Sequence, residues 1–170
     1  MGMANWVVEA LAKEHERDHF SCGQPSLDDY LKKFAKQYAK RKLGTTYVAV
    51  ATGAKRVLGY FTLAPCHFEF ADAPPALLKG LPRHPIPSLL LARLAVDRSE
   101  QGQGLGRFLL MSAFDRCLHV AREVTFRAIE VEAIDAPAAA FYRKYGFLPF
   151  PTNPFHLAIP LETVETLLGP

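Results

Sequence analysis

The pattern of apolar and polar positions along the chain predicts alternating strands and helices. An almost unbroken apolar run, Ser88–Val96, is typical of a buried strand. After it, apolar residues recur at helical spacing from Leu105 to Ala121, and polar side chains occupy the opposite face. A second helical pattern covers Leu27–Tyr38, where we expect Ser26 to begin the helix and Gly44 to end it. The spacing predicts that its apolar face contains Leu27, Tyr30, Leu31, Phe34, Ala35 and Tyr38.

The other segments predict a mixed α+β chain. Five more strands are expected at Trp6–Leu11, Thr45–Ala51, Val57–Leu63, Arg127–Ala133 and Phe155–Ile159. Two more helices are expected at Ala136–Tyr145, with Pro137 in its first turn and Gly146 at its end, and at Leu161–Leu168. Pro65 should break any extension of the strand before it, and the proline-rich stretch Ala73–Pro87 should be a loop.

The length and composition fit one folded domain, residues 1–170. Of the 170 residues, 49% are apolar, which is enough for a sizeable core. The 3 cysteines are odd in number and lack metal-ligand spacing, so we predict neither a disulfide framework nor a metal site. No apolar run reaches the roughly 18–20 residues of a membrane span. Since no signal pattern opens the chain either, we predict no membrane partner and a cytoplasmic location.

Positive charge is concentrated in one part of the chain. The net charge is only +3, yet no Asp or Glu lies between Tyr30 and Phe68. That stretch contains the cationic residues Lys32, Lys33, Lys36, Lys40, Arg41, Lys42, Lys55 and Arg56. A one-sided basic surface predicts a polyanionic partner, although a solvated lysine-rich helix face gives the same pattern.

Three glycines mark the junction between the buried strand and the helix after it, in Gln101-Gly-Gln-Gly-Leu-Gly106. Without Cβ atoms they allow a sharp turn and a close approach of a ligand to the backbone. The N–H groups of the first helical turn then offer a phosphate site. No Lys-Ser/Thr pair follows, which excludes a P-loop, and the GxGxG spacing disfavours a Rossmann dinucleotide site. A plain flexible turn is the alternative.

Two segments together resemble the GCN5-related N-acetyltransferase (GNAT) family. The family's acetyl-CoA loop reads Gln/Arg-x-x-Gly-x-Gly/Ala, matched here by Gln101, Gly104 and Gly106. Its second signature, Phe-Tyr-x-x-x-Gly-Phe, is matched by Phe141–Phe147. The resemblance extends over about Val7–Ile159. It implies the GNAT fold, a curved, mixed, mostly antiparallel sheet with helices on both faces.

The resemblance also implies where acetyl-CoA, the acetyl donor, is held. It enters between the strands ending near Val96 and starting near Arg127. Backbone groups of the first strand pair with the pantetheine arm, and a main-chain N–H near Ala95 donates to the oxyanion. Asp135 stands where many members have an Asn that touches pantetheine. The implied acetyl-CoA residues are Leu94, Ala95, Val96, Gln101, Gly102, Gln103, Gly104, Leu105, Gly106, Arg107, Asp135, Phe141 and Lys144.

Tyr142 falls where the family often places its general acid. A phenol with an ordinary pKa of about 10 is protonated at neutral pH and can give its proton to the departing thiolate. Tyr145 is the alternative acid. The central strand supplies no carboxylate as a base, which leaves Glu130 or Glu132 acting through water, or His84. An α-amino group, with an ordinary pKa of about 7.7–8.0, needs a base less than a lysine does.

A closer resemblance narrows the acceptor. The segment Phe20–Leu31 before a basic helix, and the segment Leu91–Asp97, look like the TacT-type GNAT toxins of bacterial toxin–antitoxin pairs. In that subgroup the resemblance implies N-acetylation of the amino acid on charged tRNA, which blocks translation. It also implies a ribbon-helix-helix antitoxin and a homodimer. We expect tRNA to contact Lys33, Lys36, Lys40, Arg41 and Arg93.

Two rival functions come from other classes. One is a GNAT enzyme that acetylates a small-molecule or protein amine, and it predicts turnover without RNA. The other is a binding module without activity, against which the complete glycine loop and Tyr142 argue.

Overall fold

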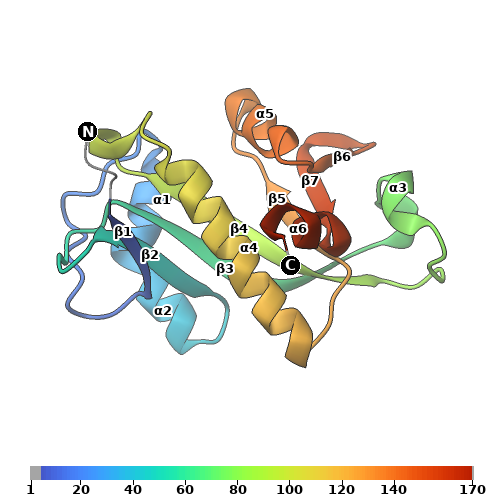
Figure 1. The fold of residues 1–170 in the computed structure, drawn as a ribbon, viewed down its shortest axis with the longest axis horizontal. Helices are drawn as coiled ribbons and strands as arrows, with labels where there is room; N and C mark the ends of the chain where they lie inside the picture. Colours follow the sequence, from blue (N-terminus) through green and yellow to red (C-terminus); the bar gives the residue numbers. More distant parts are fainter. Residues whose placement is uncertain (1–4, 170) are drawn as a thin grey trace. The chain divides into compact units, whose positions relative to one another are not determined.

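The structure is a computed structural model that describes residues 5–169 (Figure 1). Within that range, seven strands form one sheet in the order β1-β2-β3-β4-β5-β7-β6. The strands are β1 Trp6–Ala10, β2 Thr45–Ala51, β3 Gly59–Phe68, β4 Ile86–Val96, β5 Ala128–Glu132, β6 Leu148–Phe150 and β7 Asn153–Pro160. β4 and β5 are parallel, whereas β1–β2, β2–β3, β5–β7 and β6–β7 are antiparallel. The predicted mixed, mostly antiparallel sheet is therefore confirmed.

Helical segments connect these strands. The α-helices are α1 Pro25–Asp29, α2 Ala35–Lys40, α3 Pro75–Leu78, α4 Leu105–Glu123, α5 Ala136–Lys144 and α6 Leu161–Leu168. A π-helix, η1, covers Tyr30–Phe34, and the 3-10 turns are η2 Phe70–Asp72 and η3 Arg98–Glu100. The chain divides into two compact units: unit 1 is Met1–Ala64 with Arg93–Ala113, and unit 2 is Pro65–Ala92 with Phe114–Pro170. Whether the chain behaves as one domain stays a prediction.

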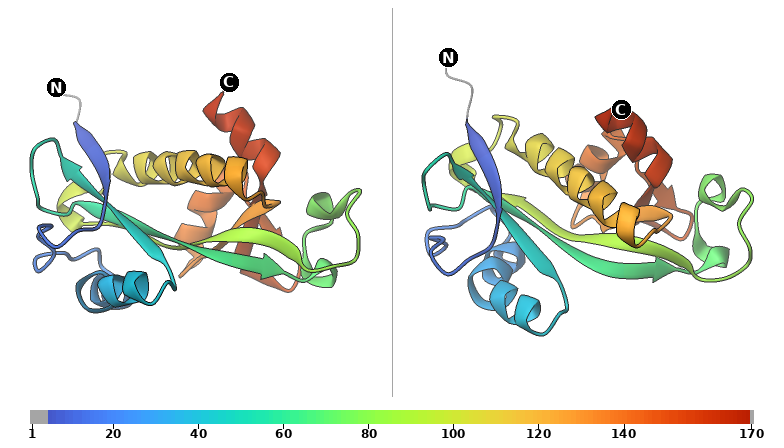
Figure 2. Two further views of the ribbon diagram at one scale, coloured as in Figure 1. Left: turned by 90° about the horizontal axis from the view of Figure 1, so that it is seen from below. Right: turned by 60° about the horizontal axis from the view of Figure 1, so that its bottom comes forward.

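In unit 1, helices cover both faces of the strands. The α1–η1–α2 segment lies on one face, and the beginning of α4 lies on the other (Figure 2). The apolar positions of the α1–η1–α2 segment pack against the inward-facing side chains of β2. This core contains Phe20, Tyr30, Leu31, Ala35, Val48, Val50, Val57, Tyr60 and Ala95. It anchors the basic helix and the end of β4 in the same unit.

The basic helix begins one residue before Ser26, and Ser26 does not cap it. Pro25 occupies its first turn, where a missing N–H costs nothing. In η1 the N–H of Ala35 bonds to the carbonyl of Tyr30, five residues back. This wider turn rotates the residues after it relative to a regular helix. Phe34, assigned to the buried face by its spacing, is consequently 45% exposed.

The helix also ends earlier than predicted. Its last residue is Lys40, and Lys42 then adopts a φ of +60°. Left-handed backbone at a residue with a side chain is uncommon. Gly44 lies beyond this turn, directly before β2, so the assignment of the helix stop to Gly44 was wrong.

Unit 2 has its own apolar core around the ends of β3 and β4. That core contains Phe68, Ala73, Leu77, Ile86, Ala128, Phe150 and Ala158. Pro65 does not interrupt β3, because the pairing of β3 with β2 already ends at Leu63 and no ladder bond on that side is lost. The proline-rich stretch is not wholly a loop, since it contains α3 and the start of β4.

Candidate functional site

The glycine turn after β4 has the predicted strand-to-helix geometry. Gly102 and Gly104 have φ angles of +80° and +88°, which residues with a Cβ rarely adopt. A Cβ at either position would meet no atom within 4 Å, so the space over the turn is open. The N–H of Phe108 bonds to the carbonyl of Gly104, and the amides of the preceding residues point ahead of the helix. Gly106 already lies inside α4.

Buried hydrogen bonds hold this turn in place. Asp97 is 5% exposed, and its carboxylate accepts from the N–H of Ser21 at 2.9 Å and from the Ser99 hydroxyl at 2.6 Å. Burial alone would raise the pKa of Asp97, but these hydrogen bonds outweigh it and lower the pKa. The Gln101 side chain donates to the carbonyls of Cys22 and Val96. Gln101 thus braces the turn with its side chain, leaving only its backbone to face a ligand.

The end of β4 extends past its pairing with β5. The parallel register runs from Ser88 opposite Ala128 to Leu91 opposite Val131. β4 then continues to Val96 outside this register. The backbone of Leu94, Ala95 and Val96, predicted to pair with pantetheine, belongs to this continuation. Ala95 itself is fixed by the core of unit 1.

Of the two candidate acids, Tyr142 in α5 is more buried than Tyr145, which directly follows the helix. Tyr142 is 7% exposed, and its ring lies 5.3 Å from that of Phe141 and 5.3 Å from that of Phe147, centroid to centroid. Burial raises the pKa of the Tyr142 hydroxyl above its ordinary value of 10, so the group is a protonated donor in the physiological range. Tyr145 is half-buried, and its ring packs on Phe141 at 5.2 Å and lies 5.6 Å from the Lys144 ammonium.

Asp135 is the N-cap residue of α5. Its carboxylate caps the helix by accepting from the N–H of Ala138 at 2.9 Å. Phe141 is half-buried and Lys144 exposed on the same helix, so both side chains are accessible.

The predicted tRNA surface is exposed. Lys33, Lys36, Lys40 and Arg41 are all solvent-exposed along η1 and α2. Lys33 forms an ion pair of 3.3 Å with Asp29, one turn earlier, so its charge is partly balanced. Arg93 belongs to a different setting: its guanidinium stacks 3.7 Å over the ring centre of Tyr30 and is half-buried. The guanidinium is therefore held by an aromatic ring.

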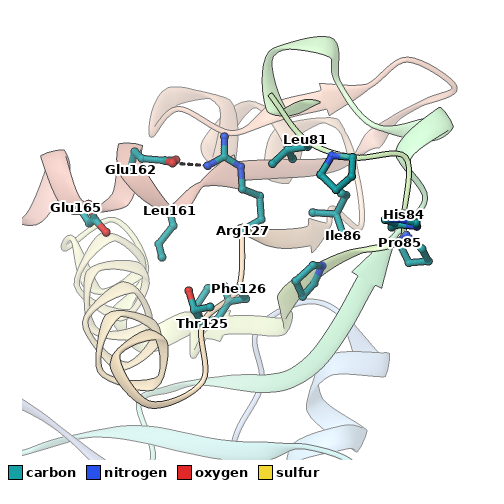
Figure 3. A pocket seen from close by; sticks show the side chains of 12 residues that line it. Leu81, His84, Pro85, Ile86, Thr125, Phe126, Arg127, Leu161, Glu162 and Glu165 are labelled. Carbon is teal, nitrogen blue, oxygen red and sulfur yellow. Dashed lines mark hydrogen bonds and ion pairs between the residues drawn. The ribbon is translucent and has the colours of Figure 1, made fainter. Parts of the chain in front are cut away.

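One cavity of unit 2 lies at the amino-terminal ends of β4 and β5 (Figure 3). It has a volume of about 390 Å³ and mostly apolar walls. Arg127 crosses it and pairs with Glu162 of α6. His84, one of the bases considered from the sequence, lies on the loop side of this cavity beside Pro85. His84 is thus at the strand ends opposite to those that the glycine turn follows.

Glu130, another base considered from the sequence, is engaged in hydrogen bonds. It is 2% exposed and accepts from the Ser88 hydroxyl and from His156, whose Nε2 lies 2.7 Å from the carboxylate. Glu132 by contrast is exposed. The contact between Glu130 and His156 escaped sequence reasoning because 26 residues separate them. Only the pairing of β5 with β7 brings them together.

Two kinds of site find no support in residues 5–169. This range holds no group of three His, Cys, Asp or Glu side chains arranged to bind a metal ion. It also holds no helix that is both long and apolar enough to cross a membrane.

Comparisons with known proteins agree on one family. A family model described as an acetyltransferase (GNAT) domain matches residues 42–149. A tRNA-acetylating toxin of Mycobacterium tuberculosis is 43% identical over 150 residues, which span 88% of this chain and 89% of the relative. The structure of AtaT complexed with acetyl-methionyl-tRNAfMet superposes with a TM-score of 0.88 at 31% identity, covering 97% of this chain and all of the other.

A further solved structure shows AtaT with its other ligands. A tyrosine-to-phenylalanine variant of this toxin, bound to acetyl-CoA and to the C-terminus of the antitoxin AtaR, superposes with a TM-score of 0.83 at 29% identity. The match covers 98% of this chain and 99% of that one.

Proposed function

Because the chain belongs to the GNAT family of acetyltransferases, we propose that it moves the acetyl group of acetyl-CoA to the α-amino group of an aminoacyl-tRNA. Such a modification blocks translation, which makes the protein a toxin. The observation that carries this proposal is the 43% identity, over 88% of the chain, to a tRNA-acetylating toxin. The likeness to AtaT complexed with acetyl-methionyl-tRNAfMet supports the same acceptor.

The glycine turn is the proposed binding site of the acetyl-CoA pyrophosphate. Gly102 and Gly104, whose φ angles are positive, leave open space over the turn, and Gln101–Arg107 contains no acidic side chain. The amides of this segment donate to the phosphates, aided by the positive end of the α4 dipole. The backbone of Leu94, Ala95 and Val96 receives the pantetheine arm, and the side of α5 that bears Phe141 and Lys144 contacts the cofactor.

Tyr142 is the proposed general acid. Acetyl-CoA supplies an acyl thioester, and its cleavage leaves a thiolate that requires a proton. The Tyr142 hydroxyl keeps its proton because burial raises its pKa, and it has no charged neighbour among the described residues that lowers it. A main-chain N–H near Ala95 donates to the oxyanion.

The exposed cations of η1 and α2 are the proposed tRNA surface. When Lys and Arg side chains neutralise tRNA phosphates, the counterions condensed on those phosphates are released. This release gives affinity without sequence specificity. Lys36, Lys40 and Arg41 have no ion pair in the described structure, so their charges are available. Lys33 contributes less because Asp29 competes for it, and Arg93 is proposed to meet the terminal phosphate or ribose.

Further partners follow from the same proposal. The AtaT variant bound to the C-terminus of AtaR supports an antitoxin as a protein partner, which we take to be of the ribbon-helix-helix class. A homodimer is the proposed assembly, as is common among toxins of this type. Charged tRNA as the acceptor places the activity in the cytoplasm.

The test reverses the charge of the three free cations. The triple variant Lys36→Glu, Lys40→Glu and Arg41→Glu should lose tRNA binding and acetyl transfer to charged tRNA, yet keep its acetyl-CoA affinity. For the wild type, log K should fall against log[salt] by roughly 0.7–0.9 per phosphate contact, so the variant should lose about 2 to 3 from that slope. Unchanged activity of the variant, with small amines labelled in place of charged tRNA, would favour the alternative GNAT enzyme acting on small-molecule or protein amines.

A further inference from the structure

One polar side chain from each of four neighbouring strands meets in unit 2. Cys66 lies on β3, Ser88 on β4, Glu130 on β5 and His156 on β7, and these strands are adjacent in the sheet. The Ser88 hydroxyl and His156 Nε2 both donate to the Glu130 carboxylate, one to each oxygen. Burial, together with the nearby Glu130 carboxylate, raises the pKa of the Cys66 thiol.

The carboxylate of this row is ionised. Burial alone would raise the pKa of Glu130, but hydrogen bonds from His156, Ser88 and Cys66 outweigh burial and lower it. An ionised carboxylate can only accept hydrogen bonds, so the Nε2 of His156 must carry the proton that the two groups share. A neutral imidazole protonated at Nε2 has its lone pair at Nδ1.

The imidazole is fixed with Nδ1 unengaged. Its ring stacks on that of Phe150, with centroids 3.7 Å apart and planes 8° from parallel. Nδ1 has no hydrogen-bond partner among residues 5–169. A buried carboxylate that orients a histidine and leaves its other nitrogen as an acceptor is the arrangement found in general bases.

His156 borders a second cavity, of about 320 Å³, with a different character from the larger one. Its other lining residues are His67, Phe68, Glu69, Asp72, Phe150 and Thr152. The carboxylates of Glu69 and Asp72 give this cavity a negative charge that favours a cation such as an ammonium group. Aromatic rings at the wall suit the apolar part of an amine-bearing ligand.

The strand register places His156 at the end of β5 where the pairing with β4 stops. His156 lies opposite Glu132, the last residue of β5, and the β4–β5 register ends one residue earlier, at Val131. The α5 helix, which carries Tyr142, follows directly after this end of β5. His156 and the helix that carries the proposed acid therefore both adjoin the carboxyl-terminal end of β5.

We propose that this cavity receives the acceptor amine and that His156, positioned by Glu130, takes the amine's proton. This inference rests on the proposed function, which leaves the base unassigned. As the amine nitrogen forms its bond to the acetyl carbon and the carbon–sulfur bond breaks, the proton of the amine passes to Nδ1 of His156. The proton from Tyr142 goes to the sulfur, so charge and protons balance.

The test compares His156→Gln with His119→Gln. The glutamine amide at 156 can still donate to Glu130 but cannot take a proton, whereas His119 is exposed on α4 and bonds to its own helix. We expect His156→Gln to lower kcat by on the order of 10²-fold with little change in KM. On the acidic side of the pH profile, the slope of log(kcat/KM) against pH should be about 2 for the wild type and about 1 for His156→Gln. The wild-type reaction requires both the amine and the base to be deprotonated, whereas the variant requires only a deprotonated amine. The His119 variant should match the wild type.

Two results overturn the inference. One is that His156→Gln acetylates charged tRNA with the wild-type kcat and an unchanged pH slope. This result would exclude His156 as the base but leave the proposed function intact, because the wild type acetylates the same tRNA. The other comes from ¹⁵N NMR of the histidine rings, which needs no substrate. We expect His156 to be protonated at Nε2, and Glu130→Gln to weaken that preference. A ring protonated at Nδ1 contradicts the inference even if charged tRNA is not the acceptor.

Discussion

Replacing Tyr142 with phenylalanine removes one hydroxyl from a ring that unit 2 already holds in place. The ring is 7% exposed and packs against Phe141 and Phe147, contacts that phenylalanine keeps. No hydrogen bond of the hydroxyl is present among the described residues, so its loss should change the free energy of unfolding by less than about 1 kcal/mol. The change isolates the proton donor from the fold.

The expected cost falls on the chemical step. General acid catalysis typically contributes about 10²–10⁴-fold, equivalent to roughly 3–5 kcal/mol of activation free energy at 1.36 kcal/mol per factor of ten. We therefore expect Tyr142→Phe to lower kcat by that factor with acetyl-CoA affinity within about twofold. Since burial raises the pKa of Tyr142, the wild-type rate should show no alkaline loss from this group up to about pH 10.

The assay follows labelled acetyl transfer to charged tRNA, with thermal unfolding and acetyl-CoA titration on the same samples. Tyr145→Phe is the matched control, because Tyr145 lies on the same helical segment and packs on the same Phe141 ring. A wild-type rate for Tyr142→Phe would show that Tyr142 is not the general acid, and a loss of rate in Tyr145→Phe instead would assign that role to Tyr145.

Two further predictions concern the turn that follows β4. Gly104→Glu should abolish acetyl-CoA binding in a calorimetric titration, because a residue with φ of +88° is strained and a carboxylate repels phosphate; retained affinity would remove the turn from the cofactor site. Asp97→Ala should destabilise the fold by about 1–3 kcal/mol in urea unfolding, since it orphans the Ser21 N–H. Because the pKa of Asp97 is lowered on folding, its stabilisation is complete above the ordinary value near 3.8 and is lost at lower pH. The wild-type and Asp97→Ala stabilities should accordingly approach each other as the pH falls below 3.8, and parallel stability curves would contradict this role of Asp97.

The sequence was sufficient where one local pattern decides the structure. The apolar run of β4, the glycines after it and the proline and glycine that bound α5 each act within a few residues, and each was predicted correctly. It failed where a non-local or competing effect decides. The π-turn at Tyr30–Phe34 leaves no mark in the apolar spacing, so Phe34 was assigned to the wrong face.

The candidate site divides in the same way. Tyr142 and the glycine turn lie in contiguous motifs, so they could be singled out by reading along the chain. The link between Glu130 and His156 exists only through the β5–β7 register, and the two residues carry no shared motif. The short strand β6 was missed for a related reason, since its three residues form a strand only by pairing with β7.

The central claim is that the protein acetylates the amino acid carried by charged tRNA. The most direct measurement incubates the wild-type protein and radiolabelled acetyl-CoA with aminoacylated tRNA, with the same tRNA after deacylation, and with a mixture of free amines. Mild base hydrolysis then releases the amino acid for mass determination. We predict label only on the aminoacylated tRNA, recovered after hydrolysis as an N-acetyl amino acid. Label that accumulates on free amines, or on deacylated tRNA to the same extent, would contradict the account.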